Sequence, residues 1–358
     1  MVNVLVLAHS NVHPRQQLFI NELGKYVKTT AVMPVYWTRG LTLRKPHLID
    51  KRNFNVYMVD TSEPGNWWPA IWGGLEKIFA TEMPEWVISW EEPFAMVNWQ
   101  LLNLKEKYGF KLLVFSWENS EYPIEDPWDK VYKKVLASCD LLQAGNMECA
   151  ALWKKRVPEV AGKTFLLPQA GVDTELFKPL NMEKEYDVIF LGNHLWPQKG
   201  CAFVDVATRE LNLKLIDVGE GPYEFRFSTK SVGYADYFDL PKYYNSAKIG
   251  CAHSMDTPRW KEQFANYFSV ECLACGLPVV NSDTEAFKEY LSSLNGKCVF
   301  LTEMGDYALI KKNIKKALTK ALSPKQEAVD VGRTYVEKEL SNKVIAKRLI
   351  DCMKMKTQ

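Results

Sequence analysis

The sequence predicts an α/β protein made of two doubly wound domains that face each other across a cleft. Apolar runs of strand length alternate with segments of helical periodicity, a pattern typical of parallel sheets covered by helices on both faces. The 358 residues suit two domains of roughly 150–180 residues each. A stretch containing Pro and Gly, residues 164–180, interrupts the alternation, and we expect the chain to pass between the domains there.

The first half of the chain carries the first set of alternating elements. Residues 2–8 form a continuous apolar run, as expected for a central parallel strand, and helical spacing follows over 16–27. The segment 37–53 is basic and irregular. The aromatic segment 66–79 is predicted to be a helix on the sheet, with a lip that touches a membrane or an acceptor as the alternative. The remaining predictions are strands at 30–35, 54–59, 86–90, 111–115 and 141–144, and helices at 94–108, 129–137 and 147–156.

The second half starts again with a strand. Residues 186–192 read YDVIFLG, and a loop and a helix over 201–211 follow. The end of the chain, 306–358, is predicted as two or three Lys-rich helices whose lysines face solvent, because apolar residues recur between them at helical spacing. Further strands are predicted at 213–218, 232–234, 247–251 and 278–281.

The composition excludes several classes of protein. A formal net charge of +2 and a pI near 8.0 do not resemble a dedicated nucleic-acid binder. The eight cysteines are scattered, and the lone C-x-x-C of Cys272 and Cys275 lies in a predicted helix, which favours buried thiols in a reducing cytoplasm over a zinc or redox site. The five histidines show no paired ligand spacing, so no metal site is expected. Without a signal peptide or a membrane-spanning run, we expect a cytoplasmic protein, at most peripheral to a membrane.

The segment 257–280, TPRWKEQFANYFSVECLACGLPVV, has the features of a binding site. It reads as loop, helix and strand, with Gly276 and Pro278 ending the helix. Glu262 precedes the helix and Glu271 lies inside it, and a buried acid needs a hydrogen-bond donor such as a ligand hydroxyl. Since unpaired N–H groups at a helix start suit a phosphate, the two features together indicate a nucleotide sugar. The alternative is a capping acid and a surface glutamate.

A second segment, FLGNHLWPQKG, follows the strand at 186–192. Gly192 and Gly200 would let the backbone approach a phosphate, and Lys199 would supply positive charge. The P-loop pattern and the G-x-G-x-x-G pattern are both absent, and the latter absence counts against an NAD-dependent oxidoreductase. A G-x-S-x-G elbow is also absent, so a hydrolase of that type is not supported.

Several motifs in sequence order resemble the family 4 retaining glycosyltransferases of the GT-B fold, which has two Rossmann-like domains. PQAGVDTELFKP at 168–179 resembles the interdomain signature of that family, and FLGNHLWPQKG resembles its phosphate loop. TPRWKEQF followed by VECLACGLPVV resembles its donor-site pair of glutamates. WEEPFAMVNWQ at 90–100 and FSWEN at 115–119 resemble segments of its first domain. The resemblance spans almost the whole chain.

The resemblance implies a domain plan and a set of site residues. The plan is a first, acceptor domain at 1–168, a linker at 169–182, a second, donor domain at 183–340, and a helix at 341–358 that returns to the first domain. Glu262 at the sugar hydroxyls and Lys199 at the diphosphate would be catalytic, with Glu271 at the ribose. The other implied donor-binding residues are Gly192, Asn193, Arg259, Lys261, Gln263 and Phe264, and the acceptor side is His9, His13, Glu91 and Glu92.

The chain departs from the family pattern at four places. One is the loop SNVHPRQ after the first strand, which lacks the usual pair of glycines. Eight residues separate Glu262 from Glu271, whereas the family usually has seven, so Gln263 is the alternative first position. Asn193 and His194 stand where an arginine is usual, and Arg259 or Lys261 could compensate. Trp90, Glu91 and Glu92 replace a histidine at the end of a strand. There Glu91 or Glu92 either orients the acceptor hydroxyl or is structural.

The resemblance therefore predicts transfer of a hexose from a nucleotide diphosphate sugar, with retention of configuration and with no metal or other cofactor. UDP-glucose is favoured over GDP-mannose. The acceptor is unknown and could be a glycan, a lipid or a small molecule; a modified nucleic-acid base gains no support from the charge. Peripheral membrane contact and the oligomeric state stay open. Two alternatives are a nucleotide-sugar-binding protein without catalysis and a nucleotide-sugar epimerase on the same fold.

Overall fold

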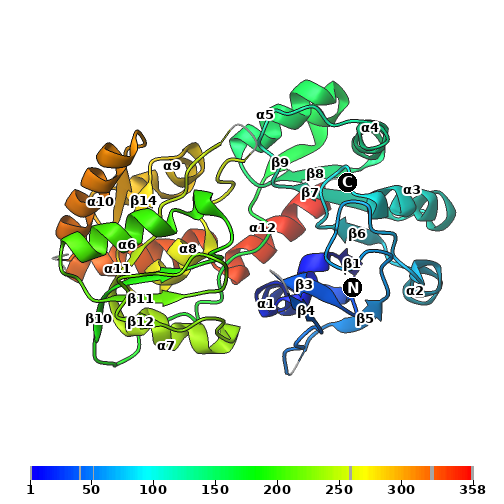
Figure 1. Cartoon of the computed structure of the whole chain (residues 1–358). Helices are drawn as coiled ribbons and strands as arrows, with labels where there is room; N and C mark the ends of the chain where they lie inside the picture. The colour runs from blue at the N-terminus through cyan, green and yellow to red at the C-terminus, as the bar shows by residue number, and fades with distance from the viewer. Residues whose placement is uncertain (1, 40–41, 51, 258–259, 323–325, 356–358) are drawn as a thin grey trace. The chain divides into compact units, whose positions relative to one another are not determined.

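The structure is a computed structural model that describes residues 2–39, 42–50, 52–257, 260–322 and 326–355. The chain divides into two compact units. Unit 1 comprises Met1–Gly171 and Asn342–Gln358, and unit 2 comprises Val172–Ser341. Each unit contains a sheet of parallel strands covered by helices, so the predicted class, two Rossmann-like α/β domains, is confirmed (Figure 1).

The sheet of unit 1 has the strand order β5-β2-β1-β6-β7-β8-β9. Neighbouring strands are parallel, and the central strand β1 pairs with β2 on one side and with β6 on the other. A short antiparallel hairpin, β3 with β4, lies outside this sheet. The bounds of these strands are β1 (Asn3–Leu7), β2 (Lys28–Pro34), β3 (Trp37–Arg39), β4 (Thr42–Arg44), β5 (Asn55–Val59), β6 (Trp86–Ser89), β7 (Lys111–Ser116), β8 (Leu141–Ala144) and β9 (Thr164–Leu166).

Both faces of this sheet are covered by helices because side chains alternate along each strand. On β1, Val4 and Val6 join one core with α1 (Pro14–Leu23) and α12 (Asn342–Met355). Leu5 and Leu7 join the opposite core with α2 (Leu75–Glu82), α3 (Met96–Tyr108), α4 (Trp128–Ser138) and α5 (Met147–Arg156). The last helix of the chain, α12, is therefore part of unit 1. Two 3-10 turns, η1 (His9–Val12) and η2 (Pro158–Lys163), complete the unit.

Two expectations for unit 1 were wrong, and one strand was not expected. The aromatic segment 66–79 is not a helix throughout: it runs through turns until Gly74, which has a φ of 67°, and α2 begins only at Leu75. The segment 37–53, expected to be irregular, contains the β3–β4 hairpin. The stretch 164–180 opens with β9, which extends the sheet beside β8. In each case a short element depends on a neighbouring segment for its pairing or packing, and local periodicity does not report that neighbour.

The sheet of unit 2 has the strand order β12-β11-β10-β13-β14-β15, again with parallel neighbours. α6 and α10 pack together on one face of the sheet, whereas α8 contacts β13, β14 and α11. The strands are β10 (Tyr186–Leu191), β11 (Leu215–Val218), β12 (Lys230–Ser231), β13 (Ala247–Cys251), β14 (Val279–Ser282) and β15 (Val299–Thr302). The helices are α6 (Cys201–Glu210), α7 (Leu240–Asn245), α8 (Tyr267–Ala274), α9 (Glu285–Leu291), α10 (Tyr307–Ala321) and α11 (Gln326–Tyr335), with the short turns η3 (Pro197–Lys199), η4 (Tyr237–Asp239), η5 (Ser292–Leu294) and η6 (Val336–Leu340).

Helix α8 begins and ends as the sequence predicts. The Asn266 side chain caps its start by accepting from the N–H of Ser269 at 2.8 Å. At its end the N–H of Leu277 donates to the carbonyl of Cys272, and Gly276 takes a φ of 75°, which only glycine adopts without strain. Elsewhere in unit 2, the strand expected at 232–234 is instead β12, two residues earlier, and α9 and β15 were not predicted.

The cysteines are free thiols, all buried except Cys352, which is half-buried. Among the described residues, no helix has the length and the apolar character that crossing a membrane requires.

Candidate functional site

The strand order marks one position in each unit where a ligand is expected. The order reverses beside the first strand of each sheet, between β1 and β6 in unit 1 and between β10 and β13 in unit 2. In open parallel sheets, ligands bind beyond the carboxyl ends of the strands at this point. The expected donor residues Gly192, Asn193 and Lys199 follow β10, and those at 261–264 follow β13, whereas His9 and Glu91 follow β1 and β6.

A pocket of about 170 Å³ lies at the carboxyl ends of β10 and β13 in unit 2. A Cβ atom at Gly200 would lie 1.9 Å from the carbonyl oxygen of His253, so a glycine is needed where the loop after β10 crosses the end of β13. The N-cap of α8 also reaches this pocket through Asn266. Its lining is Phe190, Leu191, Gly192, Lys199, Ala252, Ser254, Asn266 and Phe268.

Glu262 is a buried carboxylate held beside this pocket. It is 6% exposed, and the Nζ atom of Lys199 lies 3.3 Å from its Oε2. The hydroxyl of Ser254 donates to the same oxygen, and the backbone N–H of Glu262 donates to Asp256 Oδ1 at 3.0 Å. Lys199 also lies over the ring of Trp260, 4.6 Å from its centroid. The structure therefore brings together Lys199 and Glu262, the two residues expected to be catalytic.

The other expected donor residues differ in how deeply they are buried. Phe264 is buried and packs edge-on against Tyr290, with ring centroids 4.7 Å apart. Gln263 and Lys261 are half-buried, and Asn193 is exposed. The Asn193 side chain accepts from the N–H of Leu195 at 2.7 Å, so it shapes the loop after β10. Arg259 lies outside the described residues.

His194, which stands where the family usually has arginine, is not a cation at the pocket. Its ring is buried in unit 2 against Phe190 and Phe225. Burial lowers the pKa of His194, although the carboxylate of Asp217, 4.0 Å from Nε2, acts in the opposite direction. The imidazole is therefore neutral at physiological pH.

Glu271 lies fully buried on α8, with 0% of its surface exposed. The hydroxyls of Tyr237 and Tyr244 donate to its two oxygens at 3.2 and 2.7 Å. The alternative of a surface glutamate is therefore wrong for this residue. The expected role of Glu271 is to accept a hydrogen bond from a ribose. For that contact, the side chains that bury the carboxylate would have to move.

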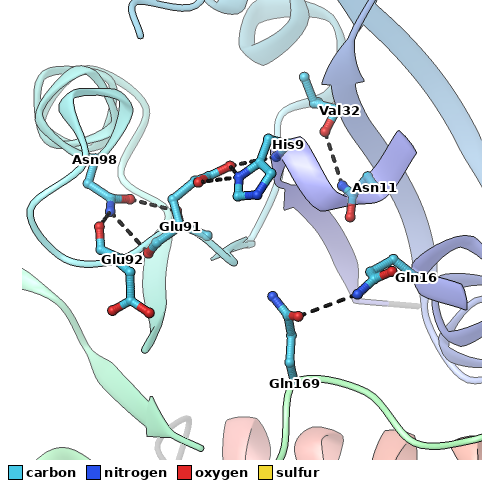
Figure 2. A network of polar contacts seen from close by, with 9 residues as sticks. His9, Asn11, Gln16, Val32, Glu91, Glu92, Asn98 and Gln169 are labelled. Carbon is cyan, nitrogen blue, oxygen red and sulfur yellow. Dashed lines mark hydrogen bonds and ion pairs between the residues drawn. The ribbon is translucent and has the colours of Figure 1, made fainter. Parts of the chain in front are cut away.

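A histidine–glutamate pair lies at the carboxyl ends of β1 and β6 in unit 1 (Figure 2). His9 begins η1 directly after β1, and Glu91 follows β6; these strands are neighbours in the sheet. The backbone N–H of His9 donates to Glu91 Oε1 at 2.5 Å, and Nδ1 of its ring lies 2.9 and 2.7 Å from Oε1 and Oε2. The Glu91 side chain is 1% exposed and that of His9 is 25% exposed.

Two buried asparagines hold the turns that carry this pair (Figure 2). Asn98 on α3 donates to the carbonyls of Glu91 and Glu92 at 3.3 and 2.8 Å, and it accepts from the Ser89 hydroxyl at 2.6 Å. Asn11 in η1 donates to the carbonyls of Val6 and Val32, each at 3.0 Å. Neither asparagine was expected from the sequence; an amide on a predicted buried helix face is the signal that could have indicated Asn98.

Aromatic rings surround His9. Its ring stacks with Trp37, with centroids 4.8 Å apart, and with Trp67, with centroids 6.1 Å apart. Trp67 in turn contacts Trp68 and Phe94. Sequence reasoning missed this cluster because it assigned Trp67 to a helix and Trp37 to an irregular segment.

Glu92 and His13 do not join the His9–Glu91 pair. Glu92 turns toward the end of β7, where Ser116 Oγ and the N–H of Trp117 donate to its two oxygens, the latter at 2.7 Å. Burial, followed by the negative charge of Glu118, raises the pKa of Glu92 to about 8. His13 lies at the junction of η1 and α1, where its carbonyl accepts from the N–H of Gln17.

In the described parts of the chain, no three His, Cys, Asp or Glu side chains gather closely enough to hold a metal ion.

Comparisons with known proteins agree with the fold. Residues 185–320, within unit 2, match the family model of glycosyl transferases group 1, so this segment, which includes Lys199 and Glu262, is a domain of that type. A comparison with curated proteins found no match.

Several solved structures share the fold along the whole chain. Sucrose-phosphate synthase from Thermosynechococcus elongatus is 15% identical, with 99% of both chains covered and a TM-score of 0.74. HepE from Anabaena, solved with UDP and glucose, is 14% identical, with 99% of this chain and 100% of that chain covered and a TM-score of 0.73. A glycosyltransferase from Rickettsia africae is 14% identical, with 100% of this chain and 99% of that chain covered and a TM-score of 0.71. At these identities the likeness concerns the fold, which is the two-domain α/β fold of glycosyltransferases.

The raised pKa of Glu92 predicts a pH-dependent stability. A carboxyl whose folded pKa lies near 8, against an ordinary 4.5, stabilises the fold below about pH 4.5; this contribution is lost as the pH rises toward 8. Glu92→Gln, which imitates the protonated acid, should therefore lose less stability than the wild type between pH 5 and 8. Urea unfolding at several pH values measures this difference. Glu106→Gln, on the exposed side of α3, is the matched control and should follow the wild type. Parallel curves for all three proteins would contradict the assignment.

Proposed function

We propose that the protein is a glycosyltransferase that moves a hexose from a nucleotide diphosphate sugar to an acceptor hydroxyl. The observation that carries this proposal is the ion pair of the half-buried Lys199 with the buried Glu262, beside the pocket at the ends of β10 and β13. It lies within the segment that matches the glycosyl transferases group 1 model. A cation and a carboxylate in one pocket suit a ligand that carries both phosphates and hydroxyls.

Each part of the pocket has a role in this proposal. Lys199, only partly buried, offers its ammonium group to the diphosphate, and Gly192 lets the backbone approach it. As the bond between the sugar and the diphosphate breaks, Lys199 stabilises the negative charge that develops on the leaving group. Glu262, oriented by Ser254 and Lys199, accepts hydrogen bonds from the sugar hydroxyls.

The donor we favour is UDP-glucose, because HepE, which shares the fold, has been solved in complex with UDP-glucose. Retention of configuration, independence from metal ions and a cytoplasmic location complete the proposal. Retention and metal independence rest on the family resemblance. The cytoplasmic location rests on the free thiols. The acceptor is held by unit 1.

A nucleotide-sugar-binding protein without catalysis is the second candidate. It is favoured by the neutral, buried His194 in the place of the usual arginine, and by the engagement of both Glu271 oxygens with tyrosines. Slow hydrolysis of the donor separates the two candidates, because a protein that only binds the donor releases no free sugar from it.

A thermal-shift panel tests the donor. UDP, GDP, ADP and their sugar conjugates are compared, with and without EDTA. A ligand at 100 times its Kd adds about 2.7 kcal/mol, which raises Tm by roughly 5–10 °C in a domain of this size, at about 2–4 °C per kcal/mol. We expect UDP and UDP-glucose to give the largest shift, unchanged by EDTA. No shift with any nucleotide would overturn the proposal, and a shift only with added metal would overturn metal independence.

Substitution at Lys199 tests the diphosphate contact. Lys199→Ala should weaken UDP binding by roughly 1.5–3 kcal/mol, about 10- to 150-fold in Kd, as for a lost charge-assisted hydrogen bond. Isothermal titration calorimetry measures the change. Lys248→Ala removes the same charge from the amino end of β13, where Lys248 pairs with Asp187, and should leave the Kd unchanged. Equal Kd values for wild type and Lys199→Ala would remove Lys199 from the site.

Glu262 and Gln263 can be distinguished by activity. Glu262→Ala should abolish release of glucose from UDP-glucose while circular dichroism shows an intact fold, since Lys199 keeps access to water. Gln263→Ala should retain most of the activity. The opposite result would mean that the expected register of the two acids is wrong by one residue.

A further inference from the structure

His9 offers one free ring nitrogen at the carboxyl end of β1 in unit 1. Its Nδ1 atom is engaged by both oxygens of Glu91, and its ring is stacked with Trp37 and Trp67. Within the described residues, Nε2 has no hydrogen-bond partner, and the side chain is 25% exposed. Because Glu91 fixes the Nδ1 edge of the ring and the two tryptophans stack with it, Nε2 points in a fixed direction.

The pairing with Glu91 determines what Nε2 can do. A buried carboxylate accepts hydrogen bonds and donates none, so the proton of a neutral His9 lies on Nδ1. Nε2 then carries a lone pair and accepts a hydrogen bond from a ligand hydroxyl. Asn98 supports this arrangement, because it holds the backbone of the turn that carries Glu91 (Figure 2).

The surroundings restrict the ligand to an uncharged one. Besides Glu91, Glu118 lies beyond the end of β7, where its negative charge helps to keep the neighbouring Glu92 protonated. Glu118 accepts from the hydroxyl of Tyr122 at 2.8 Å and from the N–H of Ser120. A phosphate or carboxylate on the ligand would be repelled by this acidic edge.

Trp67 adds an apolar ring next to His9. Its indole is half-buried, and its neighbours Trp68 and Phe94 hold it in place. A sugar ring has hydroxyls around its rim and C–H groups on its faces, so it can bond to an imidazole at its edge and pack on an indole at its face. A hydrocarbon chain would leave Nε2 without a partner, which makes a lipid tail the poorer match.

We propose that His9 and Trp67 form a carbohydrate subsite in unit 1, with Glu91 as the residue that positions His9. A hydroxyl of an uncharged sugar donates to Nε2, and the sugar ring packs against Trp67. This rests on the proposed function in one respect: it names the acceptor of that reaction as a carbohydrate. The subsite itself is defined by side chains of unit 1 alone.

Saccharide binding without any nucleotide tests the proposal. Methyl β-D-glucoside, maltose, cellobiose and lactose are titrated into the full-length protein, with saturation-transfer NMR as the readout. We expect at least one to bind, and His9→Ala and Trp67→Leu each to weaken it at least about fivefold, as for one lost hydrogen bond or packing contact. Trp67→Leu leaves Glu91 paired, so it reports on the subsite even if His9→Ala fails to fold. Trp99→Leu is the matched control and should bind saccharides as the wild type does. Trp99 is a half-buried tryptophan on α3, and the ammonium group of Lys134 lies over its ring.

Three results would overturn the subsite. One is the absence of binding by any saccharide, and another is unchanged binding in both His9→Ala and Trp67→Leu. The third is an equal loss in Lys199→Ala, which would place the sugar in the pocket of unit 2. Glucose 6-phosphate should not bind at His9, and its binding there would contradict an uncharged ligand. If saccharides bind but no nucleotide raises Tm, the proposed function is refuted and the subsite is retained. If a nucleotide raises Tm but no saccharide binds, only the subsite is refuted.

Discussion

The parallel pairing of strands around β1 and β10 is the constraint on which both candidate sites depend. Parallel strands end at the same edge of a sheet, and the reversal of strand order beside the first strand leaves room for a ligand there. In unit 2 this brings Lys199, which follows β10, to Glu262 and Ser254, which follow β13. In unit 1 it brings His9 to Glu91. The chemistry of both units therefore follows from the order of their strands.

Three buried acids and the half-buried Glu92 show how each site manages the cost of burying a charge. Glu262 is stabilised by the ammonium group of Lys199 and Glu91 by the ring of His9. Glu271 accepts from two tyrosine hydroxyls. Glu92 instead keeps its proton, because burial and Glu118 raise its pKa to about 8. The partners of Glu262 and Glu91, which are Lys199 and His9, are partly exposed and can contact a ligand. Glu271 is fully buried with its two tyrosines and is not accessible to a ligand.

Sequence reasoning located the regular elements well where periodicity was strong and the ends were marked. The strands at 141–144 and 247–251 and the helix at 147–156 have the predicted bounds. It failed at β9, β12 and the hairpin β3–β4, which are two or three residues long and exist because another strand lies beside them. It also failed at the segment 66–79, where glycines divert the chain and the tryptophans pack as separate side chains.

The sequence by itself determined the α/β class, the order of the elements and the candidates Lys199 and Glu262, because these depend on local periodicity and on residues close together in the chain. Only the tertiary structure decided which acids meet which partners. Glu91 meets His9 across 82 residues, and Glu271 meets Tyr237 and Tyr244 across 34 and 27. No local pattern encodes such contacts, because they arise when strands pair and helices pack, and those events set the distances between side chains.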